Sequence, residues 1–202
     1  MIIALSGYGG CGKDTVADIL VEEFGFYKYA WADTLRMAAS ALNPIVEVDE
    51  YGAALRYNDV VAAVGYNEAK FAYPEVREIL QRLGTEVGRE LIGDNVWVNA
   101  TLSRIERERL PGENIVIADT RFLNEANVLT NGSFHFGRGE NLVVRVERPG
   151  VAPAGAHISE TALDDYKFDR TIINDGSLDD LRTTVIDLFK NATEELSGLR
   201  LF

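Results

Sequence analysis

Residues Gly7 to Thr15, Gly-Tyr-Gly-Gly-Cys-Gly-Lys-Asp-Thr, have the composition and spacing of a loop that binds a polyphosphate. Four residues separate Gly7 from Gly12, and Lys13 follows directly. Glycines let successive backbone N–H groups turn toward an anion, and the lysine adds a charge between its terminal phosphates. The apolar run Ile2–Leu5 precedes the loop and a helical pattern over about 12–23 follows it, so a helix N-terminus would face the anion. The alternative is a glycine-rich turn that only joins a strand to a helix.

The loop departs from the usual pattern after its lysine. Asp14 stands where Ser or Thr is common, and the hydroxyl comes one place later, at Thr15. Cys11 lies inside the loop, where it is either a reactive thiol or a small side chain that fills a tight turn. It is the single cysteine of the sequence, which excludes an internal disulfide, and two histidines argue against a zinc site.

The overall composition indicates a globular domain that handles small anionic ligands. Of the 202 residues, 47% are hydrophobic, which is enough for a substantial core. The 32 acidic and 20 basic residues give a net charge of −12, which argues against binding a nucleic-acid polymer through its phosphates. No apolar run approaches the roughly 18 residues of a membrane span, and Met1 leads directly into an apolar segment without a secretory signal. We therefore expect a cytoplasmic protein without membrane contact.

Short apolar segments alternate with helical patterns, which predicts an α/β fold. The expected strands are Ile2–Ser6, Phe26–Ala30, Ile115–Asp119, Leu142–Glu147 and Thr171–Asn174. Helical spacing covers residues 12–23, 33–43, 50–65, 74–91, 95–109, 121–130 and 178–196, the last after a Ser177 cap. This alternation predicts a parallel sheet with helices on both faces.

Two intervals are longer than a connection between strands requires. Residues about 33–110 carry several helices and no strong strand, so we expect a helical lobe beside the sheet. Residues about 148–165 begin with Arg148-Pro-Gly-Val-Ala-Pro-Ala-Gly-Ala156, a composition found in lids that close over ligands. An ordered surface connection is the alternative for this interval. We therefore predict a single domain, 1–202, with a lobe and a lid.

Charged residues near the expected strand ends could complete a phosphate site. Asp119 ends an apolar strand, where a carboxylate can bind a phosphate-bound magnesium ion; a strand that ends in Asp because the chain turns is the alternative. Arg121, two residues further on, could clamp an acceptor phosphate. Three arginines of the predicted lobe could point inward or remain solvated surface charges: Arg36, Arg77 and Arg89.

Seven short segments, in order along nearly the whole chain, together resemble the bacteriophage deoxynucleoside monophosphate kinases. They are Gly7–Thr15, Tyr29-Ala-Trp-Ala-Asp33 with Leu35, Leu83-Gly-Thr-Glu-Val-Gly-Arg89, Asp94 with Trp97, Asp119-Thr-Arg-Phe-Leu-Asn-Glu125, His157-Ile-Ser-Glu160 and Asn174-Asp-Gly176. The resemblance implies a P-loop NTPase fold with a five-stranded parallel sheet of order 2-3-1-4-5 and a helical substrate-binding lobe. It also implies that ATP, with Mg²⁺ as cofactor, donates its γ-phosphoryl group to a deoxynucleoside monophosphate.

Together with the loop chemistry, the resemblance suggests roles for individual residues. ATP is expected to bind Gly7, Gly9, Gly10, Cys11, Gly12, Lys13, Asp14, Thr15, Asn174 and Gly176. The acceptor is expected to bind Asp33, Arg36, Arg77, Gln81, Thr85, Arg89, Trp97, Arg121 and Glu160. Core packing is the alternative for Trp97, and a simple turn is the alternative for Asn174-Asp-Gly176. Thr15 and Asp119 would hold magnesium, while Lys13, Arg121 and Arg148 would act on the transferring phosphate.

Two other functions fit parts of the pattern. A kinase of the same fold that acts on another small molecule, such as dephospho-coenzyme A, would share the loop and differ in its acceptor. A nucleotide-switch module of the GTPase type would need a guanine-reading Asn-Lys-x-Asp segment, which the sequence lacks. The apolar residues Leu199, Leu201 and Phe202 could pack on the chain's own core or on a second copy, so that a homodimer is a further expectation.

Overall fold

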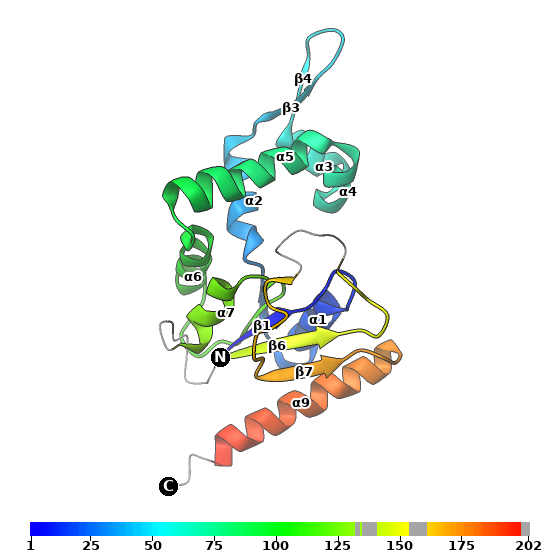
Figure 1. The fold of residues 1–202 in the computed structure, drawn as a ribbon, viewed down its shortest axis with the longest axis vertical. Coiled ribbons are helices and arrows are strands. Elements are labelled where there is room, and N and C mark those ends of the chain that lie inside the picture. The colour runs from blue at the N-terminus through cyan, green and yellow to red at the C-terminus, as the bar shows by residue number, and fades with distance from the viewer. Residues whose placement is uncertain (132–133, 135–140, 154–160, 199–202) are drawn as a thin grey trace. The chain divides into compact units, whose positions relative to one another are not determined.

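The computed structural model describes residues 1–131, 134, 141–153 and 161–198, with side chains as far as residue 190 (Figure 1). The main sheet contains β1 (Ile2–Ser6), β2 (Tyr27–Tyr29), β5 (Ile115–Ile117), β6 (Leu142–Glu147) and β7 (Arg170–Ile173). A separate pair of strands is β3 (Ile45–Val48) and β4 (Ala54–Arg56). The helices are α1 (Lys13–Phe24), α2 (Ala32–Leu42), α3 (Tyr57–Val64), α4 (Tyr66–Ala72), α5 (Pro74–Arg82), the π-helix η1 (Leu83–Ile92), α6 (Val96–Glu108), α7 (Leu123–Thr130) and α9 (Leu178–Gly198).

Strand β1 occupies the centre of the main sheet. The strand order is β2-β5-β1-β6-β7, and neighbouring strands of this sheet run parallel. Counted along the chain, these five strands have the order 2-3-1-4-5, which confirms the predicted topology. Because the strands are parallel, their carboxyl ends meet at one edge of the sheet, and the loop that begins at Gly7 starts there.

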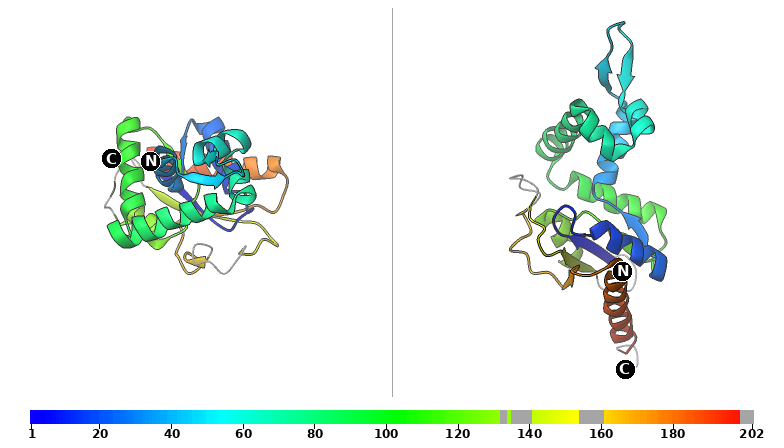
Figure 2. Two further views of the ribbon diagram at one scale, coloured as in Figure 1. Left: turned by 90° about the horizontal axis from the view of Figure 1, so that it is seen from above. Right: turned by 90° about the vertical axis from the view of Figure 1, so that its right-hand side faces the viewer.

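The core follows from the alternation of side chains along the strands. Ile3 and Leu5 of β1 belong to a buried cluster that also contains residues of α1, β6 and α9. Their neighbours Ile2 and Ala4 point to the opposite face and are also fully buried. The strands are therefore covered on both faces, and Figures 1 and 2 show α9 running along β7. Among the described residues, no helix combines the length and apolar character needed to cross a bilayer.

The chain divides into two compact units. The first, called the sheet unit below, comprises Met1–Trp31 and Arg104–Phe202. The second, the helical unit, comprises Ala32–Ser103. The lobe predicted for about 33–110 covers this second unit and the remainder of α6.

The structure corrects the predicted helix over residues 50–65 at its beginning. Residues 45–56 form the antiparallel hairpin of β3 and β4 instead, and the helix starts only at Tyr57. Asp49 determines the reversal, because its Oδ1 accepts the backbone N–H groups of Tyr51 (2.9 Å) and Ala53 (2.8 Å). Gly52 adopts φ +83°, which completes the turn.

Helix α9 begins as the sequence predicts, after a cap at Ser177. Ser177 Oγ accepts the N–H of Asp180 (3.2 Å), and Asp180 Oδ2 accepts the N–H of Ser177 (2.9 Å). A Cβ on Gly176 would lie 2.7 Å from Asp180 Oδ2, so the cap itself accounts for glycine at this position.

Residues at both ends of the predicted lid are described, whereas residues 154–160 lie outside the described part. Leu163 is buried, and the Tyr166 N–H donates to its carbonyl in a turn that also joins Asp164 to Thr161. The predicted substrate residue Glu160, and His157 with it, lies outside the described residues.

Candidate active site

The loop between β1 and α1 has a backbone that requires glycine at two places. Gly7 has φ +142°, and a Cβ there would lie 2.2 Å from the carbonyl oxygen of Val146 on β6. Gly12 has φ +106°, and a Cβ there would lie 2.5 Å from Asn174 Nδ2. Both the left-handed backbone and the close neighbours therefore exclude larger side chains. The first and last glycines of the motif fix where the loop leaves the sheet and where it enters the helix.

Lys13, the first residue of α1, is largely buried and reaches back into the loop. Its Nζ donates to the carbonyl oxygens of Gly7 (2.6 Å) and Tyr8 (2.8 Å) and lies 3.8 Å from Cys11 Sγ. The ammonium group is thereby held inside the loop, at the N-terminus of α1. The positive end of the helix dipole repels the ammonium group, and a bound anion would compensate both positive charges. This position therefore suits an anionic ligand.

Asn174 joins the end of β7 to the same loop. Its Nδ2 donates to the Cys11 carbonyl (2.9 Å), and its own N–H donates to the carbonyl of Glu147 (2.7 Å). The sequence predicts that Asn174 binds ATP, and the structure places its side-chain amide on the loop backbone. Cys11 is 1% exposed, which favours the packing alternative for its thiol.

A cavity of about 450 Å³ opens beside the loop in the sheet unit. It gathers most of the residues predicted to bind ATP, together with Arg148 and two apolar residues of α9: Gly10, Gly12, Lys13, Asp14, Thr15, Arg148, Asn174, Gly176, Leu178 and Leu181. The lining residues do not include Gly7, Gly9 or Cys11. Gly7 packs against Val146, and the Cys11 carbonyl accepts a hydrogen bond from Asn174. Leu178 and Leu181 were missed as site residues because the helical period of α9 also marks them as core positions.

Asp14 does not turn toward the loop interior. Its carboxylate is 82% exposed and pairs with Lys28 of β2 (3.0 Å), which also pairs with Asp18 (2.9 Å). The carboxylate of Asp14, which the sequence predicts to bind ATP, therefore takes part in a surface ion pair. Asp14 nevertheless lines the cavity, together with its neighbours Lys13 and Thr15.

Asp119 follows β5 and holds the chain where it leaves β2. Its Oδ1 accepts the Trp31 N–H (2.6 Å), and the Trp31 indole donates to Thr120 Oγ1 (3.1 Å). These contacts support the turn alternative for Asp119, and its metal role stays a prediction. Arg121 lies at the same carboxyl edge; its N–H donates to Glu125 Oε2 (2.8 Å) and so helps to start α7.

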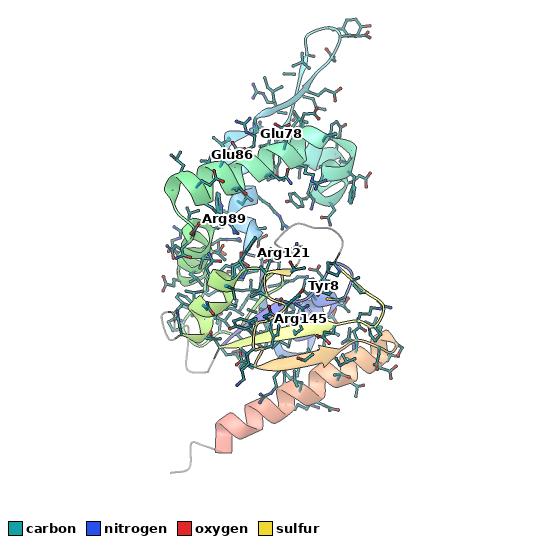
Figure 3. All side chains as sticks on the ribbon, viewed as in Figure 1. Tyr8, Glu78, Glu86, Arg89, Arg121 and Arg145 are labelled. Carbon is teal, nitrogen blue, oxygen red and sulfur yellow. The ribbon has the colours of Figure 1, made fainter. Side chains whose placement is uncertain are left out.

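Tyr8 anchors the loop to a distant part of the sheet unit. Its hydroxyl donates to Asp164 Oδ1 (2.9 Å), which also accepts Arg145 Nη2 (3.1 Å). The Arg145 guanidinium lies over the Tyr8 ring, 4.7 Å from its centroid (Figure 3). It also lies 5.4 Å from the centroid of the Phe168 ring. Burial, followed by the hydrogen bond to Asp164, raises the pKa of Tyr8 above its ordinary value. The hydroxyl therefore remains a donor at neutral pH. Sequence reasoning missed this group because its members come from three distant segments.

Arg148 lies just beyond β6, between two cavities of the sheet unit. It lines the 450 Å³ cavity and also one of about 350 Å³ on the Tyr8 side of the loop. The second cavity is bordered by Arg145, Val146 and Val151 among others. An exposed cation between these cavities can reach a bound polyphosphate without crossing the core.

In the helical unit, four predicted acceptor residues follow one stripe of α5 and η1: Arg77, Gln81, Thr85 and Arg89. The adjacent stripe is buried and contains Val76, Leu80, Gly84 and Gly88. Arg77, Gln81 and Thr85 are exposed. Asp33 and Arg36 on α2 form an ion pair (3.1 Å), so this unit also brings together two further predicted acceptor residues.

Trp97 explains the glycine at position 88, whereas a Cβ on Gly84 would lie 3.1 Å from Cδ2 of Leu35. Trp97 Nε1 donates to the Gly84 carbonyl (2.9 Å), and a Cβ on Gly88 would lie 2.4 Å from the same nitrogen. The indole therefore packs directly on the backbone of η1, a π-helix, which is a helix type often found at functional sites. These contacts favour the packing alternative for Trp97 over a stacking wall for the substrate base.

Comparisons with known proteins agree with this arrangement. The model of the family described as deoxynucleotide monophosphate kinase matches residues 55–185. A protein of Acanthamoeba polyphaga mimivirus, named "Putative deoxynucleotide monophosphate kinase", is 24% identical over 206 residues, covering 96% of this chain and 98% of its own. The uncharacterized protein ORF77 of Ictalurid herpesvirus 1 is 27% identical over 180 residues, covering 87% of this chain and 64% of its own. These relatives are viral, but neither is from a bacteriophage, so that part of the resemblance stays a prediction.

A solved structure supports the fold alone. The dephospho-CoA kinase of Campylobacter jejuni has a TM-score of 0.50 and 11% identity, and the match covers 96% of this chain and 98% of that chain. The five-stranded parallel sheet and its covering helices are thus those of a P-loop kinase.

Proposed function

The chain belongs to the deoxynucleotide monophosphate kinase family, and from this premise we propose that it transfers the γ-phosphoryl group of ATP to a deoxynucleoside monophosphate, giving a deoxynucleoside diphosphate and ADP. The observation that carries the proposal is the cavity that Lys13, Thr15 and Arg148 line together with glycines of the loop. This arrangement suits the polyphosphate of a donor nucleotide. Leu178 and Leu181 offer an apolar wall on which a base could rest.

The reaction needs no covalent intermediate on the protein. A phosphate oxygen of the acceptor attacks the γ-phosphorus, the bond from that phosphorus to the β,γ-bridging oxygen breaks, and its electron pair leaves with ADP. The protein's task is to hold two anions in line and to stabilise the charge on the transferring group. Lys13 would move from the carbonyls of Gly7 and Tyr8 to the donor's terminal phosphates. Arg148, and Arg121 at the carboxyl edge of the sheet, would stabilise the same group.

Two oxygen donors of the sheet unit fit a nucleotide-bound Mg²⁺. Such an ion keeps several waters and phosphate oxygens and needs only one or two protein ligands. The Thr15 hydroxyl and the Asp119 carboxylate are oxygen donors of that kind, and the described residues contain no group of three or more His, Cys, Asp or Glu that would form a separate metal cage. When bound, the ion would neutralise charge on the donor phosphates.

The acceptor side of the proposal rests on the helical unit. The residues of this unit that we expect to contact the acceptor are Asp33, Arg36, Arg77, Gln81, Thr85 and Arg89. The dephospho-coenzyme A alternative shares the donor loop, and the fold likeness does not favour one acceptor over another. The identity of the acceptor therefore has to come from an assay.

A panel of acceptors tests the proposal directly. Purified protein with Mg²⁺ and ATP is incubated with each of the four deoxynucleoside monophosphates, with dephospho-coenzyme A or with no acceptor, and ADP and phosphorylated products are separated by ion-exchange chromatography. We expect stoichiometric diphosphate and ADP with at least one deoxynucleoside monophosphate. Turnover of dephospho-coenzyme A alone, or ATP hydrolysis that no acceptor stimulates, would refute it.

A further inference from the structure

Two cations of the helical unit meet at one aromatic ring. The guanidinium carbon of Arg36, on α2, lies 4.2 Å from the centroid of the Tyr66 ring. Lys70 Nζ, one turn along α4 from Tyr66, lies 4.5 Å from the same centroid. Both positive charges are therefore within a few ångströms of one ring, although they come from different helices.

The charge of this unit makes the convergence unusual. Residues 32–103 contain eleven acidic and six basic residues, and Lys70 is their one lysine. In such an acidic segment, each cation is more stable beside carboxylates than beside another cation, because like charges repel each other. The ring's negative face compensates part of that repulsion. Asp33 pairs with Arg36 through Nη1 of the guanidinium (3.1 Å).

The local structure holds these groups while leaving them accessible. Gly65, with φ +80°, turns the chain so that Tyr66 begins α4, and the Ala69 of that helix is fully buried. The ion pair with Asp33 fixes the Arg36 guanidinium, yet its side chain remains 37% exposed. Tyr57, at the start of α3, is buried nearby; burial raises its pKa and Arg36 opposes the shift, so that its hydroxyl stays protonated at neutral pH.

We infer that Arg36 and Lys70, arranged on the Tyr66 ring, form the subsite that binds the phosphate of the acceptor monophosphate. A guanidinium donates charge-assisted hydrogen bonds to a phosphate dianion, and an ammonium adds a second positive charge. The inference rests on the proposed function and deepens it, because it adds Lys70 and Tyr66, which the sequence did not single out, to the acceptor residues. The donor loop belongs to the other unit, so the two anions would be bound by different sets of cations.

Steady-state kinetics with Lys70→Gln and Arg36→Gln test the subsite. We expect each substitution to raise KM for the deoxynucleoside monophosphate by roughly tenfold or more, with KM for ATP within about twofold of the wild type. Lys70→Arg should restore most of the affinity because it retains the charge. Arg82→Gln is the matched control: Arg82 is an exposed cation of the same unit, it pairs with Glu86, and its loss should leave both constants unchanged.

The ring is tested separately. Tyr66→Phe should keep KM near the wild-type value because the aromatic ring that both cations contact is retained, whereas Tyr66→Leu should raise KM for the acceptor. Thermal unfolding of each variant shows whether it is folded. A folded Lys70→Gln protein with unchanged acceptor KM, or one whose KM for ATP rises equally, would overturn the inference.

Direct binding separates this inference from the proposed function. Calorimetric titration compares each deoxynucleoside monophosphate with its deoxynucleoside, which lacks the phosphate, on wild-type, Lys70→Gln and Arg82→Gln proteins. A phosphate-dependent gain in affinity that only Lys70→Gln loses supports the subsite even if the wild type fails to turn over. A wild type that binds no monophosphate, or a gain that survives Lys70→Gln, refutes the subsite even if the kinase assay succeeds.

Discussion

The two units build their sites from contacts of very different range. In the sheet unit, the glycine loop is held by Asn174, 163 residues from its partner Cys11, and by Asp164, 156 residues from Tyr8. In the helical unit, the ion pair of Asp33 and Arg36 spans three residues, and the Trp97 contact with Gly84 spans 13. The donor loop thus depends on the finished fold, whereas the helical unit shapes its candidate site within a contiguous segment.

This difference predicts how substitutions divide between the two substrates. Changes at the loop or its distant anchors should act on ATP, and changes along α5 and η1 should act on the acceptor. A substitution in one unit that changed KM for the substrate assigned to the other unit would contradict this division.

The largest effect is expected for Lys13→Ala. Removing the ammonium inside the loop takes away a charge that the transferring phosphate needs, so kcat/KM should fall by about a thousandfold. Initial rates of ADP formation measure it. Lys167→Ala, at an exposed lysine, should be near normal, and an active Lys13→Ala protein would contradict the loop's donor role.

Gly12→Ala should be the next largest. A Cβ at φ +106° is strained and meets Asn174 Nδ2 at 2.5 Å, so the free energy of unfolding should fall by about 2 kcal/mol and KM for ATP should rise. Urea denaturation and ATP titrations measure the two effects. Gly9→Ala is the control for stability, because a Cβ on Gly9 would have nothing within 4 Å; equal losses of unfolding free energy for both variants would argue against the geometry of Gly12.

Gly88→Ala is the counterpart in the helical unit. The added methyl meets the Trp97 indole, which should lower stability by about 1 kcal/mol and raise KM for the acceptor while KM for ATP stays constant. A double-mutant cycle with Trp97→Phe, which shortens the ring, should recover part of the loss. If the two changes were simply additive, the contact would not be the cause.

Tyr8→Phe should have the smallest effect, about 0.5 kcal/mol, because it removes one partly exposed hydrogen bond and keeps the ring on Arg145. The effect should depend on pH. Since the pKa of Tyr8 is raised in the folded protein, its contribution is fully present below the ordinary value of about 10 and is lost as the pH rises through the raised pKa. The difference in unfolding free energy between wild type and Tyr8→Phe should therefore shrink as the pH rises above about 10; a constant difference would contradict it.

Much of the fold could be predicted because its signals are local. The glycine loop, the Ser177 cap and the alternation of strands and helices each depend on residues close together in the sequence, and the structure has them where they were expected. The predicted helix over 50–65 failed at its start because the side chain of Asp49 stabilises a turn more strongly than helical spacing indicates.

The sequence by itself determined that a lysine would stand behind a glycine loop at the carboxyl edge of a parallel sheet, because spacing and period are properties of the chain alone. Only the tertiary structure decided that Asn174 holds that loop, that Asp119 bonds to Trp31, and that Arg36 and Lys70 meet at Tyr66. Each of these contacts joins side chains that no local pattern links, and they come together only when packing brings separate segments within hydrogen-bonding or ring-contact distance.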